Sequence, residues 1–193
     1  LMLAILLYYG LKRLTALFSS TTIRERFVKY LLIGSLVFSA YSFGANDVGN
    51  ATGIYVTITE EFVGLPPFET IILLAAFGSA GIAFGGFTWG YRVIATTGYR
   101  ITRLTPVKGL SAEMSNALVV WIFTTLPYYL FGWGMPVSTT HSSVGAIIGV
   151  GLVSGLKTLE QKTIIKIILA WFLTLPCTAL LSLAMFKLVL ILL

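Results

Sequence analysis

A run of polar and small residues interrupts an otherwise apolar segment at positions 44–53, which read Gly-Ala-Asn-Asp-Val-Gly-Asn-Ala-Thr-Gly. A carboxylate at membrane depth is costly and is normally kept for pairing with an ion, a substrate or another side chain. Asp47, with Asn46 beside it and Asn50 one turn on, therefore predicts an ion or anion site. The alternative is a packing patch, in which the glycines approach a neighbouring helix and the carboxamides form hydrogen bonds across the contact.

The same run predicts a break in its helix. Residues 30–59 are apolar or hydroxylic outside the polar run. At 1.5 Å per residue they would extend about 45 Å, more than one straight crossing of a hydrocarbon core of about 30 Å. Three glycines would let the helix open, and interrupted helices of this composition are typical of the binding sites of secondary transporters.

A second polar stretch, Gly-Met-Pro-Val-Ser-Thr-Thr-His-Ser-Ser, occupies positions 134–143. Pro136 favours the start of a helix, and Ser138 or Thr139 suits its N-cap. Free backbone N–H groups at a helix start favour an anion, and the hydroxyls of Ser138, Thr139 and Thr140 would add donors without a positive charge. The alternative is that these hydroxyls bond back to their own helix.

Two further ionisable residues are candidates. His141, the single histidine, is either a hydrogen-bonded structural residue, which we favour, or a proton carrier. Glu113 either pairs with Lys108 or Arg103 at a loop end, or faces inward as a cation ligand. With Asp47 it would supply the hard oxygen ligands that a cation such as sodium prefers.

Composition defines the class of protein. Of 193 residues, 57% are hydrophobic and 10% are charged, which indicates an all-α, polytopic membrane protein of about five to six transmembrane or re-entrant helices. The net charge of +6 does not indicate nucleic-acid binding, because the basic residues fall in three short clusters between apolar segments, as in cytoplasmic loops.

We expect a single transmembrane domain over residues 1–193. It comprises the end of a transmembrane helix at 1–11, a cytoplasmic basic segment at 12–29, and motif-bearing helices over 30–193, at 30–59, 68–91, 109–131, 135–154 and 163–193. The acidic loop near Glu60 should face outside, opposite the basic clusters. Only residues 132–134 separate the third and fourth helices, so these form a tight hairpin that either crosses the membrane or re-enters it. Pro176 predicts a kink in the last helix.

Three stretches together resemble the inorganic phosphate transporter (PiT) family, which includes sodium–phosphate symporters. Residues 44–51 resemble the family's GANDVANA signature, with Gly49 where alanine is usual. Residues 136–141 match its PVSTTH signature, and residues 109–113 resemble its G-x-x-A-E turn. The family is built from two homologous halves in inverted orientation, each with one such set, and this chain carries one set without an internal repeat.

The resemblance implies that this chain is the C-terminal half of an inverted-repeat transporter. It also implies a multi-pass protein of the cell membrane. The homologous N-terminal half would be a separate chain or lie outside this sequence, which starts at Leu1 as if partway through a longer protein. Alternatively, a half-length protein assembles as a homodimer. The residues that the resemblance assigns to phosphate are Asn46, Asp47, Asn50, Ser138, Thr139 and Thr140. Those that it assigns to sodium are Asp47, Asn50, Glu113 and Ser138.

The expected function is sodium-coupled transport of inorganic phosphate by alternating access, with sodium as coupling ion and no other cofactor. The expected partners are phosphate, sodium, the lipid bilayer and the other half. Alternatives are a sulfate or other oxyanion permease, proton coupling through Asp47 or His141, and a non-transporting receptor or structural subunit. An enzyme is not expected, because one histidine and two carboxylates at membrane depth offer no nucleophile–base pair.

Overall fold

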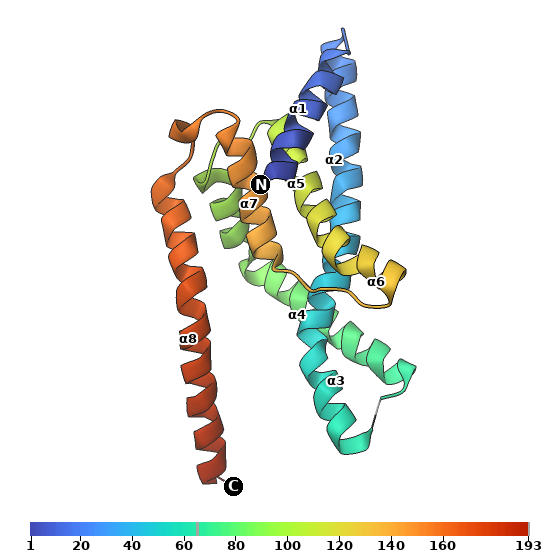
Figure 1. Cartoon of the computed structure of the whole chain (residues 1–193), viewed down its shortest axis with the longest axis vertical. Coiled ribbons are helices and arrows are strands. Elements are labelled where there is room, and N and C mark those ends of the chain that lie inside the picture. Colours follow the sequence, from blue (N-terminus) through green and yellow to red (C-terminus); the bar gives the residue numbers. More distant parts are fainter. Residues whose placement is uncertain (65, 193) are drawn as a thin grey trace. The chain divides into compact units, whose positions relative to one another are not determined.

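The computed structural model describes residues 1–64 and 66–192, which form helices joined by turns (Figure 1). No strand occurs within these residues, so the all-α prediction is confirmed. Leu193, the last residue of the final expected segment, lies outside them. The α-helices are α1 Met2–Ala16, α2 Thr21–Phe43, α3 Gly49–Val63, α4 Phe68–Ala95, α5 Pro106–Val120, α6 Leu126–Phe131, α7 Thr139–Leu152 and α8 Gln161–Leu192. Short π-helical segments occur at Gly44–Val48, Thr96–Arg100 and Trp121–Thr125, and a 3-10 turn at Leu156–Thr158.

Four helical stretches of the described chain are long and apolar enough to span a membrane. They are Thr21–Phe62, Phe68–Arg100, Pro106–Phe131 and Gln161–Ile191. Helices α1 and α7 are shorter, with 15 and 14 residues. At 1.5 Å per residue α7 extends about 21 Å, less than the hydrocarbon thickness of about 30 Å, so α7 alone does not cross. The multi-pass helical architecture is therefore confirmed.

The expected break at the first motif is wrong, because the chain stays helical through residues 44–53. The motif begins with a π-helical segment, Gly44–Val48, which joins α2 to α3. Gly44 and Gly49 have ordinary helical φ angles of −55° and −57°. A π-helical turn accommodates extra backbone by widening the helix, so the N–H and C=O groups stay paired within it. The chain is non-helical instead at the second motif, where residues 133–138 connect α6 to α7.

Helix α5 lies at the centre of residues 1–159 and packs against α1, α2 and α7. Its buried residues include Leu110, Ala117 and Val120, each 0% exposed. Val144 and Val150 of α7 are likewise buried. By contrast, α4 has no buried residue, and its aromatic side chains such as Phe87 are exposed. Such an apolar surface suits lipid or another membrane-embedded chain, not water.

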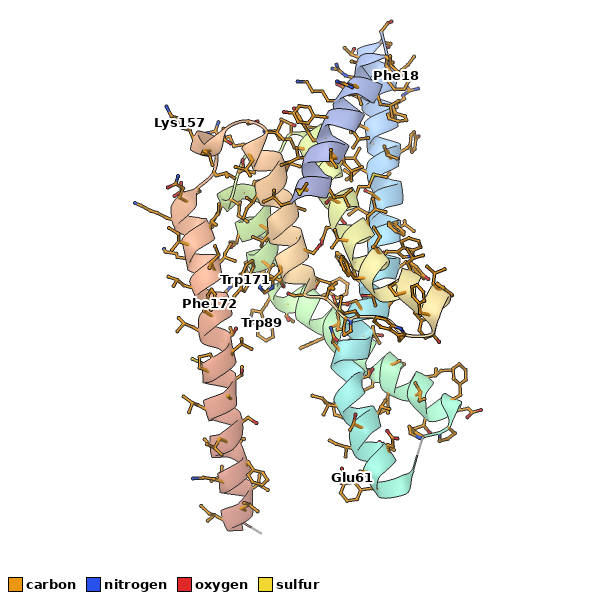
Figure 2. The ribbon with its side chains drawn as sticks, viewed as in Figure 1. Phe18, Glu61, Trp89, Lys157, Trp171 and Phe172 are labelled. Carbon is orange, nitrogen blue, oxygen red and sulfur yellow. The ribbon has the colours of Figure 1, made fainter. Side chains whose placement is uncertain are left out.

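The basic loops converge at one end of this unit. Lys12 and Lys29 border the same cavity as residues 105–107, which precede Lys108 of α5. Lys108 Nζ donates to Ser154 Oγ at 2.5 Å, and this bond ties the start of α5 to the loop after α7. Figure 2 shows Phe18 and Lys157 toward this end, and Glu61 at the opposite end of the unit. The expected separation of basic and acidic loops is thus seen in the structure.

Helix α8 belongs to a second compact unit, residues 160–193, and we describe it by itself. It runs from Gln161 to Leu192, and Pro176 lies inside it without ending it. Lys166 and Lys187 bracket an uncharged stretch of 20 residues. At 1.5 Å per residue this stretch extends about 30 Å, which matches one crossing of the hydrocarbon core.

Candidate functional site: a polar junction between two motifs

The two polar motifs meet through the side chain of Asn46. Its Nδ2 donates to the backbone oxygen of Val137 at 2.9 Å, and its Oδ1 accepts from the backbone N–H of Val137 at 2.9 Å. Nδ2 also donates to Asp47 Oδ1 at 2.8 Å, and Oδ1 also accepts from Thr124 Oγ1 at 3.0 Å. A carboxamide has two donor hydrogens and two acceptor lone pairs, so these four bonds use its full capacity.

Asn46 is 2% exposed, so these bonds lie away from solvent. The connecting segment after α6 has backbone groups that no helix satisfies, and buried backbone groups must find partners. Asn46 bonds to both the N–H and the C=O group of Val137 and so fixes this segment against the π-helical segment Gly44–Val48. The side chain therefore acts in this structure as a clamp between the motifs.

Two π-helical segments aim the residues of the clamp at each other. Asn46 lies in Gly44–Val48 and Thr124 in Trp121–Thr125, and these two segments contact each other. Widened turns of this type occur frequently at functional sites. Thr124 Oγ1 also lies 3.3 Å from Met135 O. Thr124 had no place in the sequence-based prediction, although Thr124 and Thr125 are adjacent hydroxyls in a largely apolar segment.

Helix α7 begins beside Asp47. Ser138, one of the two residues predicted for this position, is its N-cap, because its Oγ accepts from the backbone N–H of His141 at 3.3 Å. Thr139 Oγ1 lies 3.4 Å from both carboxylate oxygens of Asp47. The positive end of a helix dipole and its free N–H groups thus stand close to a half-buried carboxylate.

A cavity of about 470 Å³ opens at this junction. Its lining residues are Asp47, Asn50, Pro136, Val137, Ser138 and Thr139. Carboxylate, carboxamide and hydroxyl oxygens could hold a hard cation here, while hydroxyl and N–H donors could hold an oxyanion. Apart from Asn46 and His141, the sequence predicts six site residues, and four of them line this one cavity. The other two, Thr140 and Glu113, do not.

Glu113 lies in a separate cavity of about 190 Å³, shared with Asn116, Ser143 and Thr97 among others. It precedes Thr124 by 11 residues along one continuous helical stretch, which separates them by about 16 Å along the axis. Glu113 and Asp47 thus line different cavities, and Thr124, not Glu113, contacts the first motif through Asn46. The Oδ1 atom of Asn116 in this second cavity is buried and has no hydrogen-bond partner among the described residues.

The remaining candidates lie at the first turn of α7. Thr140 and His141 are exposed and outside the lining of the Asp47 cavity. His141 Nδ1 lies 2.6 Å from Ser138 Oγ, the capping oxygen. This contact fits the structural role that we favour for His141. Among the described residues, no group of three or more histidine, cysteine, aspartate and glutamate side chains is placed to hold a metal ion.

The four long apolar helical stretches define a multi-pass membrane protein, and the polar cavity lies at the junction of its two motifs. The chain belongs to the phosphate transporter family, whose model matches residues 5–182. The predicted family is therefore confirmed.

Individual relatives agree with this assignment. A Chlamydia pneumoniae protein named "Putative phosphate permease" is 40% identical over 163 residues, which cover 84% of this chain and 37% of that protein. A Pyrococcus abyssi protein of the same name is 43% identical over 153 residues, 77% of this chain and 36% of that protein. The Arabidopsis thaliana protein named "Inorganic phosphate transporter 2-1, chloroplastic" is 37% identical over 158 residues, 79% of this chain and 26% of that protein. The chain thus spans little more than a third of the length of the two permeases and about a quarter of the Arabidopsis protein. No solved structure is significantly similar to it.

Proposed function

We propose that this chain supplies one half of the central site of a secondary transporter that carries inorganic phosphate together with sodium, by alternating access. The observation that carries the proposal is the placement of Asp47 against the start of α7, with Thr139 Oγ1 3.4 Å from its carboxylate. Family membership and the relatives' names support phosphate as the substrate. Transport makes and breaks no covalent bond, so the proposal assigns no catalytic residue.

Phosphate recognition would use both faces of this junction. The N–H groups at the start of α7 and the hydroxyls of Ser138, Thr139 and Thr140 would donate to phosphate oxygens. Asp47 would accept a hydrogen bond from a P–OH group of phosphate. Sulfate at neutral pH has no such hydrogen, so an acceptor at this place favours phosphate over sulfate.

Sodium would offset the charge of the bound anion. A dianion beside the Asp47 carboxylate is strongly repelled in a site of low dielectric constant, unless cations bind with it. Asp47, Asn50 and Ser138 offer oxygen ligands in the 470 Å³ cavity. Glu113 would serve a cation separately, in its own cavity with Asn116 and Ser143.

Asn46 has a different part in this proposal. Its four hydrogen bonds hold the segment before α7 in place. It would therefore shape the phosphate site by positioning Val137 and Asp47, and would contact phosphate only if the clamp opened during the transport cycle. A homologous half, on another chain or in a second copy of this one, would complete the site from the opposite orientation.

The test is uptake of labelled phosphate into proteoliposomes that contain this chain with its homologous half, with and without an inward sodium gradient. We expect sodium-driven uptake, and a loss of at least tenfold in Asp47→Asn. Glu60→Gln removes a carboxylate from the exposed end of α3 and serves as the matched control, with uptake unchanged.

Other outcomes would change the proposal in defined ways. Uptake driven by a proton gradient alone would replace sodium as the coupling ion. Transport of sulfate without phosphate would overturn the substrate. No transport by a folded protein would favour a receptor or structural role, and Asp47→Asn would then alter only assembly or stability.

A further inference from the structure

A third, larger cavity lies at the basic end of residues 1–159, far from the two motifs in sequence. It measures about 690 Å³ and lies between α1, α2 and the start of α5. Its polar and charged lining comprises Tyr8, Lys12, Thr15, Arg24, Glu25, Lys29 and Thr105. This volume is in the range of cavities that hold small organic ligands. The proposed phosphate site does not use any of these residues.

The charge of this lining selects an anion. Lys12, Arg24 and Lys29 carry three positive charges against the single negative charge of Glu25, so the net charge is +2. All four side chains are exposed to solvent. Arginine and lysine together suit phosphate oxygens, because the guanidinium group binds two oxygens at once and the ammonium group adds a point charge.

The floor of the cavity is apolar. Val28, 7% exposed, and the half-buried Leu32 and Val107 line it. These residues belong to a small hydrophobic core formed with Leu11 and Leu110. The ligand that fits such a cavity carries a negative charge at one end and hydrocarbon at the other.

The position along α2 places this cavity at a membrane boundary. Lys29 is the last cationic residue before the apolar stretch that begins at Tyr30. The basic loops gather at this same end, which the excess of lysine and arginine assigns to the cytoplasm. The cytoplasmic leaflet carries anionic lipids, and basic pockets between transmembrane helices on this side bind their headgroups. Tyr8 is also of a type enriched at membrane interfaces.

We propose that this cavity binds the phosphodiester headgroup of an anionic phospholipid from the cytoplasmic leaflet. Lys12, Arg24 and Lys29 bind the phosphate oxygens, and the first methylene groups of the acyl chains lie on Val28, Leu32 and Val107. A lipid held there joins α1 to α2 and to the start of α5, the helix at the centre of the unit. The site does not depend on the proposed transport function.

The test compares binding of phosphatidylglycerol and phosphatidylcholine to the full purified chain, by native mass spectrometry from mixed micelles. In the unmodified chain we expect retention of phosphatidylglycerol in preference to phosphatidylcholine. In the pocket variant Lys12→Gln/Arg24→Gln/Lys29→Gln, the ratio of bound phosphatidylglycerol to bound phosphatidylcholine should fall at least fivefold. The matched control is Arg13→Gln/Arg26→Gln/Lys157→Gln, which removes the same charge from exposed residues outside the cavity and should keep the preference.

Two further measurements make the outcome decisive. Glu25→Gln raises the net charge of the lining and should strengthen the preference, a gain that misfolding cannot produce. An equal loss in the pocket and control variants would overturn the site, because non-specific attraction would then explain binding. Full displacement of phosphatidylglycerol by millimolar inorganic phosphate or glycerol phosphate would overturn the lipid assignment in favour of a soluble phosphate ligand.

Discussion

The two polar stretches of this chain both interrupt apolar segments, but they differ in backbone conformation. Residues 44–53 contain three glycines and remain helical throughout, whereas residues 133–138 leave helical geometry before α7 begins. The first stretch widens by a π-helical turn and keeps its own backbone bonds. The second depends on side chains of the first, since both polar backbone groups of Val137 bond to Asn46.

The difference shows how a non-helical segment is tolerated at membrane depth. Irregular backbone there must be covered by protein or by a water-filled cavity. Here the carboxamide of Asn46 covers the irregular segment. Like a peptide group it has both a donor and an acceptor, and it bonds to the C=O and N–H groups of Val137. Asn46 of the first motif therefore acts as scaffold, whereas Asp47 and Asn50 of the same motif line the cavity. The second motif presents the start of a helix to that cavity.

The largest expected effect follows from removing the clamp. Asn46→Ala deletes four hydrogen bonds and leaves the N–H and C=O groups of Val137 without their partner. Each unsatisfied buried group costs about 1–3 kcal/mol, so we expect a loss of about 2–4 kcal/mol in the free energy of unfolding. The measurement is denaturant-induced unfolding in detergent micelles, followed by tryptophan fluorescence.

Asn50→Ala is the matched control for this prediction. It removes the same carboxamide one turn further on, from an exposed side chain that lines the cavity. Its effect on stability should stay within about 0.5 kcal/mol. Equal effects of the two substitutions would contradict the division between scaffold and ligand-facing residues.

Several features of the fold and the site were predictable from the sequence. The length and hydropathy of the apolar runs were sufficient to predict that they are membrane-spanning helices. Long apolar runs between basic clusters have few other structures open to them. A cap at Ser138 or Thr139 followed from residue type, because Ser and Thr are preferred N-caps and Pro136 stands just before them. The structure selects Ser138. The family resemblance implied that the two motifs lie at one site. In the structure they are joined by the hydrogen bonds between Asn46 and Val137.

Other features were not predictable by the same reasoning. Glycine composition indicated that the helix can open, but not whether it does, because a π-helical turn and a break suit the same residues. Thr124 was missed because a hydroxyl in an apolar helix most often bonds to its own backbone. The separation of Glu113 from Asp47 depends on how far α5 slides along α2, which is a property of packing and not of local sequence.

A smaller effect is expected from adding a methyl group at Gly134, where the non-helical segment lies close to the helical segment before it. A Cβ atom added at Gly134 would overlap the backbone oxygen of Thr124. Gly134→Ala should therefore cost about 1–3 kcal/mol in the free energy of unfolding, as overpacking does elsewhere.

Gly145→Ala is the control, because nothing lies within 4 Å of its Cβ position. Inside α7 it should stabilise by about 0.5–1 kcal/mol. Destabilisation by both substitutions to the same extent would show that the segment is not held against Thr124.

The smallest expected effect concerns the start of α7, where the two stretches present their ligand groups. Ser138→Ala removes the N-cap oxygen and should cost about 1 kcal/mol in the free energy of unfolding. Thr140→Ala, at an exposed position two residues on, should change stability by less than about 0.5 kcal/mol.

Ser138→Asp separates stability from binding, because aspartate is an equally good cap but places a second carboxylate beside Asp47. Stability close to that of the unmodified protein, with phosphate uptake strongly reduced, would show that this helix start faces the anion. Unchanged uptake would instead remove the start of α7 from the proposed phosphate site and leave Ser138 as a cap alone.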